Sequence, residues 1–347
     1  MDHETPTHTD PAKAPRAGMI QNVFSFFALS VGLGLTVWLI VASSLTSILH
    51  SVAQIGWGIA AIIAVRAVMI TINAVAWRQL LVALVHVPFA AFAVLRWIRE
   101  AIDLLLPVAS IGGSLISARL LTYWRVSGVT ALAGVFVDVL LQTFAQAAFA
   151  LAGALLLGRL VGFDSLVSEL LLGIAVAAVA LAGFYVVQRY GGAWLIDRMR
   201  TIASGWTQYP PPRGESHFQA AMERIWHGRR RYLAAAFIIH VIAWTLGALE
   251  VWFALYFMQW PVTVEQAVVL ESLGVSISTA AFFVPGSWGV QEGGFILIGQ
   301  MLGLPGYLSL SLSLVKRIPD LALGAPGLVL WRVVEARHLL DKHHRAS

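Results

Sequence analysis

The carboxylate of Glu292 stands in a stretch of sequence that no single helix can cross. Apolar arms at 267–284 and 295–304 flank this stretch, and each is shorter than the about 20 residues that a membrane span needs. Between the arms lie one proline and several glycines, which interrupt a helix: Pro285, Gly286, Gly289, Gly293 and Gly294. Broken backbone inside a membrane persists only where protein or a wet cavity satisfies its amides. We interpret 267–304 as a re-entrant helical hairpin at a functional site. The alternative is a short polar loop outside the membrane that joins two ordinary helices.

Charged residues recur inside the apolar segments of the chain. They are Arg66, Asp138, Glu250, Glu271, Glu292, Lys316, Arg317 and Asp320. Each centred charge costs about 2.5–3.5 kcal/mol on insertion scales, so we expect these side chains to pair or to line water. Lys316 and Arg317 precede Asp320 by four and three residues, so either can meet it on one helix face.

Two kinds of role fit these buried charges. For Arg66 and Asp138 we favour ion pairs that fix helix packing, and we interpret His240 as a satisfied polar residue within a bundle. Glu292, Lys316 and Arg317 lie beside the broken backbone, where cations and half-helix N-termini could hold an anionic headgroup.

The sequence lacks the residues and motifs of several common catalytic and metal-binding sites. It has no cysteine, no Walker P-loop, no His/Glu pattern at metal-ligand spacing and no G-x-S-x-G motif, so we expect no cofactor and no metal. An acid–base enzyme that uses Glu271 and Glu292 stays open, although no nucleophile accompanies them.

The composition predicts an all-α, polytopic membrane protein. Of 347 residues, 59% are hydrophobic and 12% are charged, whereas soluble domains have roughly 25% charged residues. The net charge of +5 comes from basic loops, which membrane topology explains without nucleic acid.

Six spans fit the order of the chain. We expect a disordered N-terminus at 1–18, a membrane domain at 19–340 and a tail at 341–347. Apolar runs at 24–49, 55–72, 126–157, 170–187, 233–258 and 308–334 supply the spans. The loop at 189–231 is basic and includes an amphipathic stretch at 193–206, so the positive-inside rule places it and both termini in the cytoplasm.

A second apolar segment is interrupted by proline and glycine, and it gives the two halves of the chain the same order of elements. Residues 87–119 contain Glu100, Pro107 and the pair Gly112-Gly113, and they indicate either another hairpin or an amphipathic surface helix followed by a loop. With hairpins in both halves, roughly 20–158 and 166–338, the order span, span, hairpin, span occurs twice from opposite faces, as in many transporters.

Several motifs resemble the flippase-like transmembrane domain found in lysylphosphatidylglycerol synthases. The similar segments begin at Asn73-Ala74-Val75-Ala76-Trp77-Arg78, Ile98-Arg99-Glu100 and Val137-Asp138, and end with Pro285-Gly286-Ser287-Trp288-Gly289-Val290-Gln291-Glu292. The resemblance covers about 20–340. The block up to Gly293-Gly294, followed by Lys316-Arg317, is most similar to the hopanoid-biosynthesis-associated branch. The resemblance implies lipid handling in a bacterial inner membrane; because the aminoacyl-transfer domain is missing, it does not imply lipid synthesis.

The leading hypothesis is a flippase or transporter for a hopanoid or another polar lipid, such as an anionic phospholipid. Glu292 would orient the headgroup or couple protons, Lys316 and Arg317 would hold it, and the glycines would let backbone approach closely. The candidate substrate-binding residues are Glu292, Gly293, Gly294, Pro285, Gly286, Gly289, Glu271, Lys316, Arg317, Asp320 and Glu100. The alternatives are a scaffold that binds hopanoid-biosynthesis enzymes through 189–231 and an intramembrane lipid-modifying enzyme. A homodimer stays open.

Overall fold

The computed structural model describes a helical protein. It covers residues 30–106, 112–162, 168, 172–173, 183, 217–227, 229–281, 284 and 287–346, and its regular structure within these ranges is helical, without a strand. The helices discussed here are Ser30–Ala42, α2 (Leu45–Ile55), α3 (Gly58–Leu81), α4 (Phe89–Leu105), α5 (Gly112–Leu121), α6 (Gly128–Val161), α9 (His217–Trp226), α10 (Arg230–Phe257), α11 (Val264–Ala280), α12 (Val290–Met301) and α13 (Gly306–Ala346).

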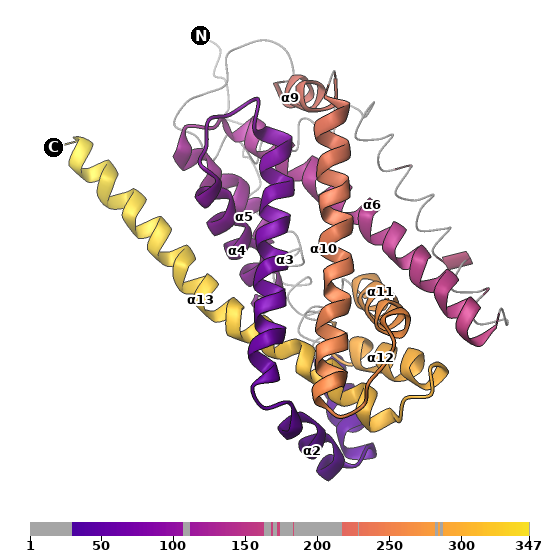
Figure 1. Ribbon diagram of the computed structural model, residues 1–347. Helices are drawn as coiled ribbons and strands as arrows, with labels where there is room; N and C mark the ends of the chain where they lie inside the picture. Colours follow the sequence, from indigo (N-terminus) through magenta and orange to yellow (C-terminus); the bar gives the residue numbers. More distant parts are fainter. Residues whose placement is uncertain are drawn as a thin grey trace, which may run out of the picture.

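Helices α3 and α10 lie side by side at the centre and run in opposite directions (Figure 1). Helix α3 starts near α2, whereas α10 starts near α9 at the other end of the bundle. Their approach is close where Gly58 faces the ring of Phe257, because a Cβ at this glycine would clash with the ring. The central pair therefore joins the two halves of the chain.

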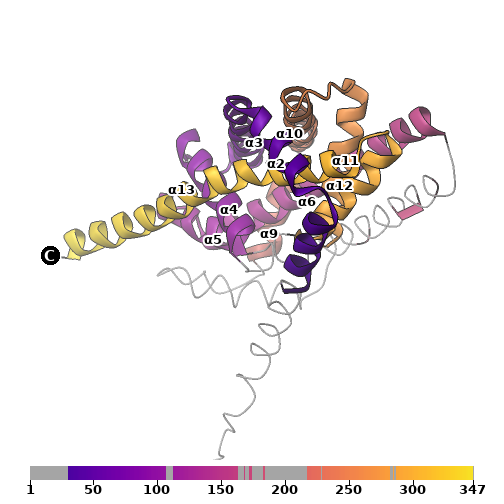
Figure 2. The same ribbon diagram turned by 90° about the horizontal axis from the view of Figure 1, so that it is seen from below.

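Each half contributes a helical hairpin and then a long helix. Helix α4 packs against α5, and α11 packs against α12. The long helix of each half covers the hairpin of the other, since α6 packs on α11 and α13 packs on α4 (Figure 2). Of the predicted order of span, span, hairpin and span, the described residues show a helix, a helical hairpin and a long helix in each half, whereas the first span of the second half lies almost wholly outside them. At 87–119, α5 is a helix where the alternative expects a loop, and α4 buries Leu95 and Ile98 completely. Whether this pair of helices re-enters the membrane stays a prediction.

The predicted membrane-spanning helices are confirmed in part. In the described ranges, α3, α6 and α10 are long and apolar enough to cross a membrane. The span expected at 24–49 is bent in its described part, where Ser30–Ala42 and α2 pass the length and hydropathy requirement together but meet at an angle of 96°, so they form either a broken span or a re-entrant segment. Ser44 starts α2 there, and its side chain accepts a hydrogen bond from the Ser47 amide. The expected span at 170–187 and the stretch at 193–206 fall almost wholly outside the described residues.

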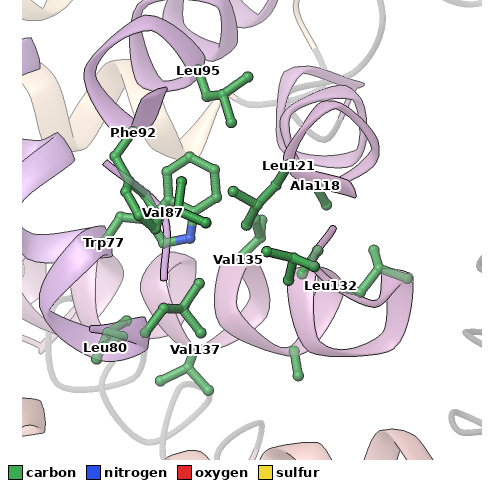
Figure 3. Close-up of a cluster of buried hydrophobic side chains, with 14 of the residues drawn as sticks. Trp77, Leu80, Val87, Phe92, Leu95, Ala118, Leu121, Leu132, Val135 and Val137 are labelled. Atoms are coloured by element: carbon green, nitrogen blue, oxygen red, sulfur yellow. The ribbon is translucent and has the colours of Figure 1, made fainter. Parts of the chain in front are cut away.

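An apolar core holds the first hairpin against the centre of the bundle (Figure 3). The Trp77 ring of α3 meets the Phe92 ring of α4 edge-on, with 5.2 Å between centroids. Leu121 of α5 and Leu132 and Val135 of α6 pack into the same core. Helix α9 closes this core with its apolar face, so the described part of the basic loop is anchored to the bundle.

Alanine at Phe92 tests this packing, because the ring is 1% exposed. A buried Phe→Ala change in a soluble core costs about 3–5 kcal/mol. We expect the lower end here, because helices that separate in detergent keep apolar surroundings. Phe89→Ala on the same helix removes a ring that is 38% exposed and should barely change the melting temperature in detergent. Equal melting temperatures for the two variants would contradict the core.

Candidate functional site

The first polar cluster is centred on Asp138 of α6, which is completely buried. Its Oδ2 accepts hydrogen bonds from Arg99 Nη1 at 2.7 Å and from Arg96 Nη1 at 3.2 Å. Its Oδ1 lies 3.2 Å from His240 Nε2. His240 Nδ1 in turn lies 2.8 Å from Asn73 Oδ1. This cluster therefore ties α3, α4, α6 and α10 together.

Carboxylates on α4 extend the first cluster toward its exposed edge. Arg96 Nη2 donates to Glu100 at 2.5 Å, and the Glu100 side chain is 27% exposed. Arg99 forms a longer ion pair with Asp103, at 3.9 Å. Asp103 Oδ1 also accepts a hydrogen bond from the Gly113 amide at 2.9 Å and so satisfies one free amide at the start of α5. One carboxylate thereby links the two arms of the hairpin.

The second polar cluster is centred on a cation, Lys316 of α13. Its Nζ donates to Glu271 Oε2 at 2.6 Å and to Glu250 Oε2 at 3.1 Å. Arg66 of α3 reaches the same Glu250 oxygen at 2.8 Å. Arg66 Nη1 also lies 3.7 Å from Asp320 Oδ1. This cluster ties α3, α10, α11 and α13 together.

The two clusters occupy matching positions with opposite charges. Arg96 is the eighth residue of α4, and Glu271 is the eighth of α11. Asp138 is the eleventh residue of α6, and Lys316 is the eleventh of α13. Gln142, which accepts from Arg96 Nη2 at 3.1 Å, and Asp320 are the fifteenth residues of those two helices. A cation–anion pair in one half is thus replaced by an anion–cation pair in the other.

Glu292 organises the start of α12. It is completely buried, and its Oε2 accepts from the Gly289 amide at 2.7 Å. Its Oε1 accepts from Arg317 Nε at 2.9 Å, and the Arg317 guanidinium stacks 3.8 Å from the centre of the Trp288 ring. Gly289 has φ +77° and lies against the Gly32 carbonyl oxygen, so a side chain there would be strained and crowded. Glu292, Arg317 and Trp288 therefore fix this turn.

The structure brings most of the predicted site residues to the second hairpin and α13. Glu271 and Lys316 meet directly, as do Glu292 and Arg317, whereas Asp320 pairs with Arg66 in place of its predicted neighbours on α13. Glu100 belongs to the first cluster. Gly294 lies against Ile277, while Gly293 has open space where a side chain would be. Pro107, Pro285 and Gly286 lie outside the described residues. Whether the site residues bind substrate stays a prediction.

Several residues of the two polar clusters are not among the site residues predicted from the sequence. Glu250 is predicted as a buried charge only, and the ion pairs predicted for Arg66 and Asp138 are present. His240 is likewise a satisfied polar residue. Arg96 and Arg99 were missed as partners of Asp138. The signal was present, because Arg96 and Arg99 precede Glu100 and Asp103, respectively, by four positions on one apolar helix.

Fold and site together define a multi-pass helical membrane protein whose hairpins enclose paired charges. In the part of the chain that the structure describes, no group of three or more His, Cys, Asp or Glu side chains could hold a metal ion. The chain belongs to the family described as the lysylphosphatidylglycerol synthase TM region, whose sequence model matches residues 25–327. This membership indicates a membrane function related to lipids. Searches of curated proteins and of solved structures gave no match.

Replacement of Asp138 by asparagine tests the first cluster. The change leaves Arg96 and Arg99 without their shared anion, and breaking a buried pair costs about 3–5 kcal/mol. We expect a clear loss of folded protein and a lower melting temperature in detergent. Glu265→Gln removes an exposed carboxylate on α11 and should leave both unchanged. If Asp138→Asn melts like Glu265→Gln, then the cluster does not hold these helices together.

Proposed function

We propose that this protein moves a polar lipid between the leaflets of a bacterial inner membrane, with a hopanoid or an anionic phospholipid as substrate. The family membership supports a lipid-related role. The observation that carries the proposal is a charged seam along α3, α4 and α13 with partly exposed edges. The side chains of Glu100, Arg66, Asp320 and Arg317 are 27%, 22%, 19% and 13% exposed.

The charges alternate in sign along this seam. Asp320 lies 3.7 Å from Arg66, and Arg66 is within electrostatic range of Glu100. The polar part of a lipid could move from one side chain of the seam to the next while its apolar tails stay in the bilayer. Each step would replace one ion pair by another, which avoids the cost of leaving a charge alone in a low dielectric.

The helix lengths support re-entrant hairpins. Helix α4 has 17 residues and α5 has 10, which corresponds to about 26 and 15 Å of rise at 1.5 Å per residue. Helices α11 and α12 have 17 and 12 residues. All are shorter than the about 30 Å hydrocarbon core of a bilayer. We propose that each pair enters and leaves on one side, that the chain has six spans, and that both termini lie in the cytoplasm.

The test is lipid exchange in liposomes that contain the purified protein and a fluorescent polar lipid. External quencher reports how fast inner-leaflet probe reaches the outer leaflet. We expect Glu100→Gln to slow this exchange about tenfold or more, because it removes the most exposed charge of the seam while Arg96 keeps Asp138 as its partner. The matched control is Glu265→Gln, which should exchange lipid like wild type.

Equal, slow exchange in wild type and in protein-free liposomes, with hopanoid and phospholipid probes both tried, would refute lipid translocation. A scaffold role would then be the better hypothesis. Wild-type exchange that Glu100→Gln leaves unchanged would remove the seam from the pathway.

The Glu292→Gln variant tests the second hairpin. Its amide oxygen can still accept from the Gly289 amide, but Arg317 loses its buried counter-charge. We expect normal expression and abolished lipid exchange in the same assay. Full activity in a folded Glu292→Gln variant would exclude this carboxylate from the mechanism.

A further inference from the structure

We propose that the second polar cluster holds one exchangeable proton, on the carboxyl groups of Asp320 and Glu250, and that this proton drives transport. The coupling to transport rests on the proposed function. Proton binding itself does not, because it follows from the charges and contacts of the cluster.

The charges of the second cluster do not balance. Three carboxylates, on Glu250, Glu271 and Asp320, face two cations, on Arg66 and Lys316. Arg317 also acts electrostatically on Asp320, but it does not restore the balance, because it pairs with the fourth carboxylate, Glu292. The cluster therefore carries one excess negative charge among side chains that are wholly or mostly buried, where an uncompensated charge is costly.

The first cluster contains a histidine ring as well as carboxylates and guanidinium groups. Its three carboxylates, on Asp138, Glu100 and Asp103, face Arg96, Arg99 and the His240 ring. The second cluster has no histidine, so a proton that balances its charge belongs on a carboxyl group.

Two oxygen atoms in the second cluster lack hydrogen bonds within the described residues. Glu250 is completely buried, yet its Oε1 has no hydrogen-bond partner there. Asp320 Oδ1 also has none, and its one ion pair among the described residues is the 3.7 Å contact with Arg66. A buried oxygen without a donor is costly, and a proton on it turns an orphan acceptor into a neutral acid group.

The surroundings favour a proton over a metal cation. No group of three or more His, Cys, Asp or Glu side chains in the described ranges could coordinate a metal ion. A proton needs one oxygen only. The Asp320 side chain is 19% exposed, which provides a route for protons, whereas Glu250 behind Arg66 has no exposure.

The proton acts through Arg66, which touches both carboxyl groups. When hydronium transfers its proton to Asp320, an O–H bond forms, water leaves and the aspartate charge disappears. Arg66 then loses one of its two counter-charges, so its Nη1 can bind an acidic or hydroxylated headgroup. Release of the proton to water restores the aspartate charge, which competes with the headgroup for Arg66. Glu100 of α4 lies within electrostatic range of Arg66 and adds to this competition.

Infrared spectroscopy of the full chain in lipid nanodiscs tests proton binding without transport. We expect a carbonyl band of a protonated carboxyl group in wild type that disappears as the pH is raised. Asp320→Asn and Glu250→Gln should each lose this titrating band, whereas Glu265→Gln and the rescue variant Asp320→Glu should keep it. An unchanged band in folded Asp320→Asn and Glu250→Gln would overturn the proposal.

Liposomes with an imposed pH gradient test the coupling. Wild-type lipid exchange should differ between the two gradient directions, and Asp320→Asn should lose this difference while Glu265→Gln keeps it. Wild-type exchange that ignores the gradient would overturn the coupling while leaving lipid translocation intact. No lipid exchange under any gradient, together with a titrating carboxyl band, would instead refute the proposed function and leave the proton site standing.

Discussion

A charge inside a membrane must meet an opposite charge, and this requirement determines how the helices of this protein are arranged. The bilayer is as apolar as the side chains, so apolar packing alone gives helices little reason to choose one neighbour over another. Asp138 supplies that choice in the first half, since three side chains from α4 and α10 converge on it. Lys316 does the same in the second half through Glu250 and Glu271. Because replacing such pairs by apolar residues is often harmless to stability, we infer that these pairs contribute mainly to the choice of helix neighbours.

The central helices interlock the two halves. Arg66 belongs to α3 of the first half but completes the cluster of the second, and His240 of α10 completes the cluster of the first. Neither half could close its own cluster alone. The reversal of sign between Arg96–Asp138 and Glu271–Lys316 also makes the halves chemically distinct, although their helices follow the same order. A molecule with two similar hairpins can thus hold two unlike environments.

The membrane class, the helical hairpins and the repeated order could be predicted from the sequence, because apolar runs and glycine breaks are local signals. The partners of the buried charges could not. Asp320 has the right spacing to pair with Lys316 on its own helix, yet Lys316 instead meets Glu250 and Glu271, which are separated from it by 66 and 45 positions. The bend near Ser43 also escaped prediction, because serines interrupt an apolar run only weakly. Charge type and spacing identify which residues need a partner, but only the packing of α3, α10 and α13 decides which partner each one finds.

The relative strengths of the ion pairs in the two clusters indicate which contacts can open when the protein changes conformation. Moving Asp138 away from its three partners would expose two buried guanidinium groups, so the first cluster is suited to hold shape. The pair of Arg66 and Asp320 is the longest contact of the second cluster, at 3.7 Å, and both side chains reach the surface. Since Coulomb energy falls with distance and with rising dielectric, this pair costs least to open. Opening it would loosen the contact between α3 and α13, the helix that packs on both α12 and α4. In the proposed transport cycle, the Arg66–Asp320 pair is therefore expected to open while the Asp138 cluster stays closed.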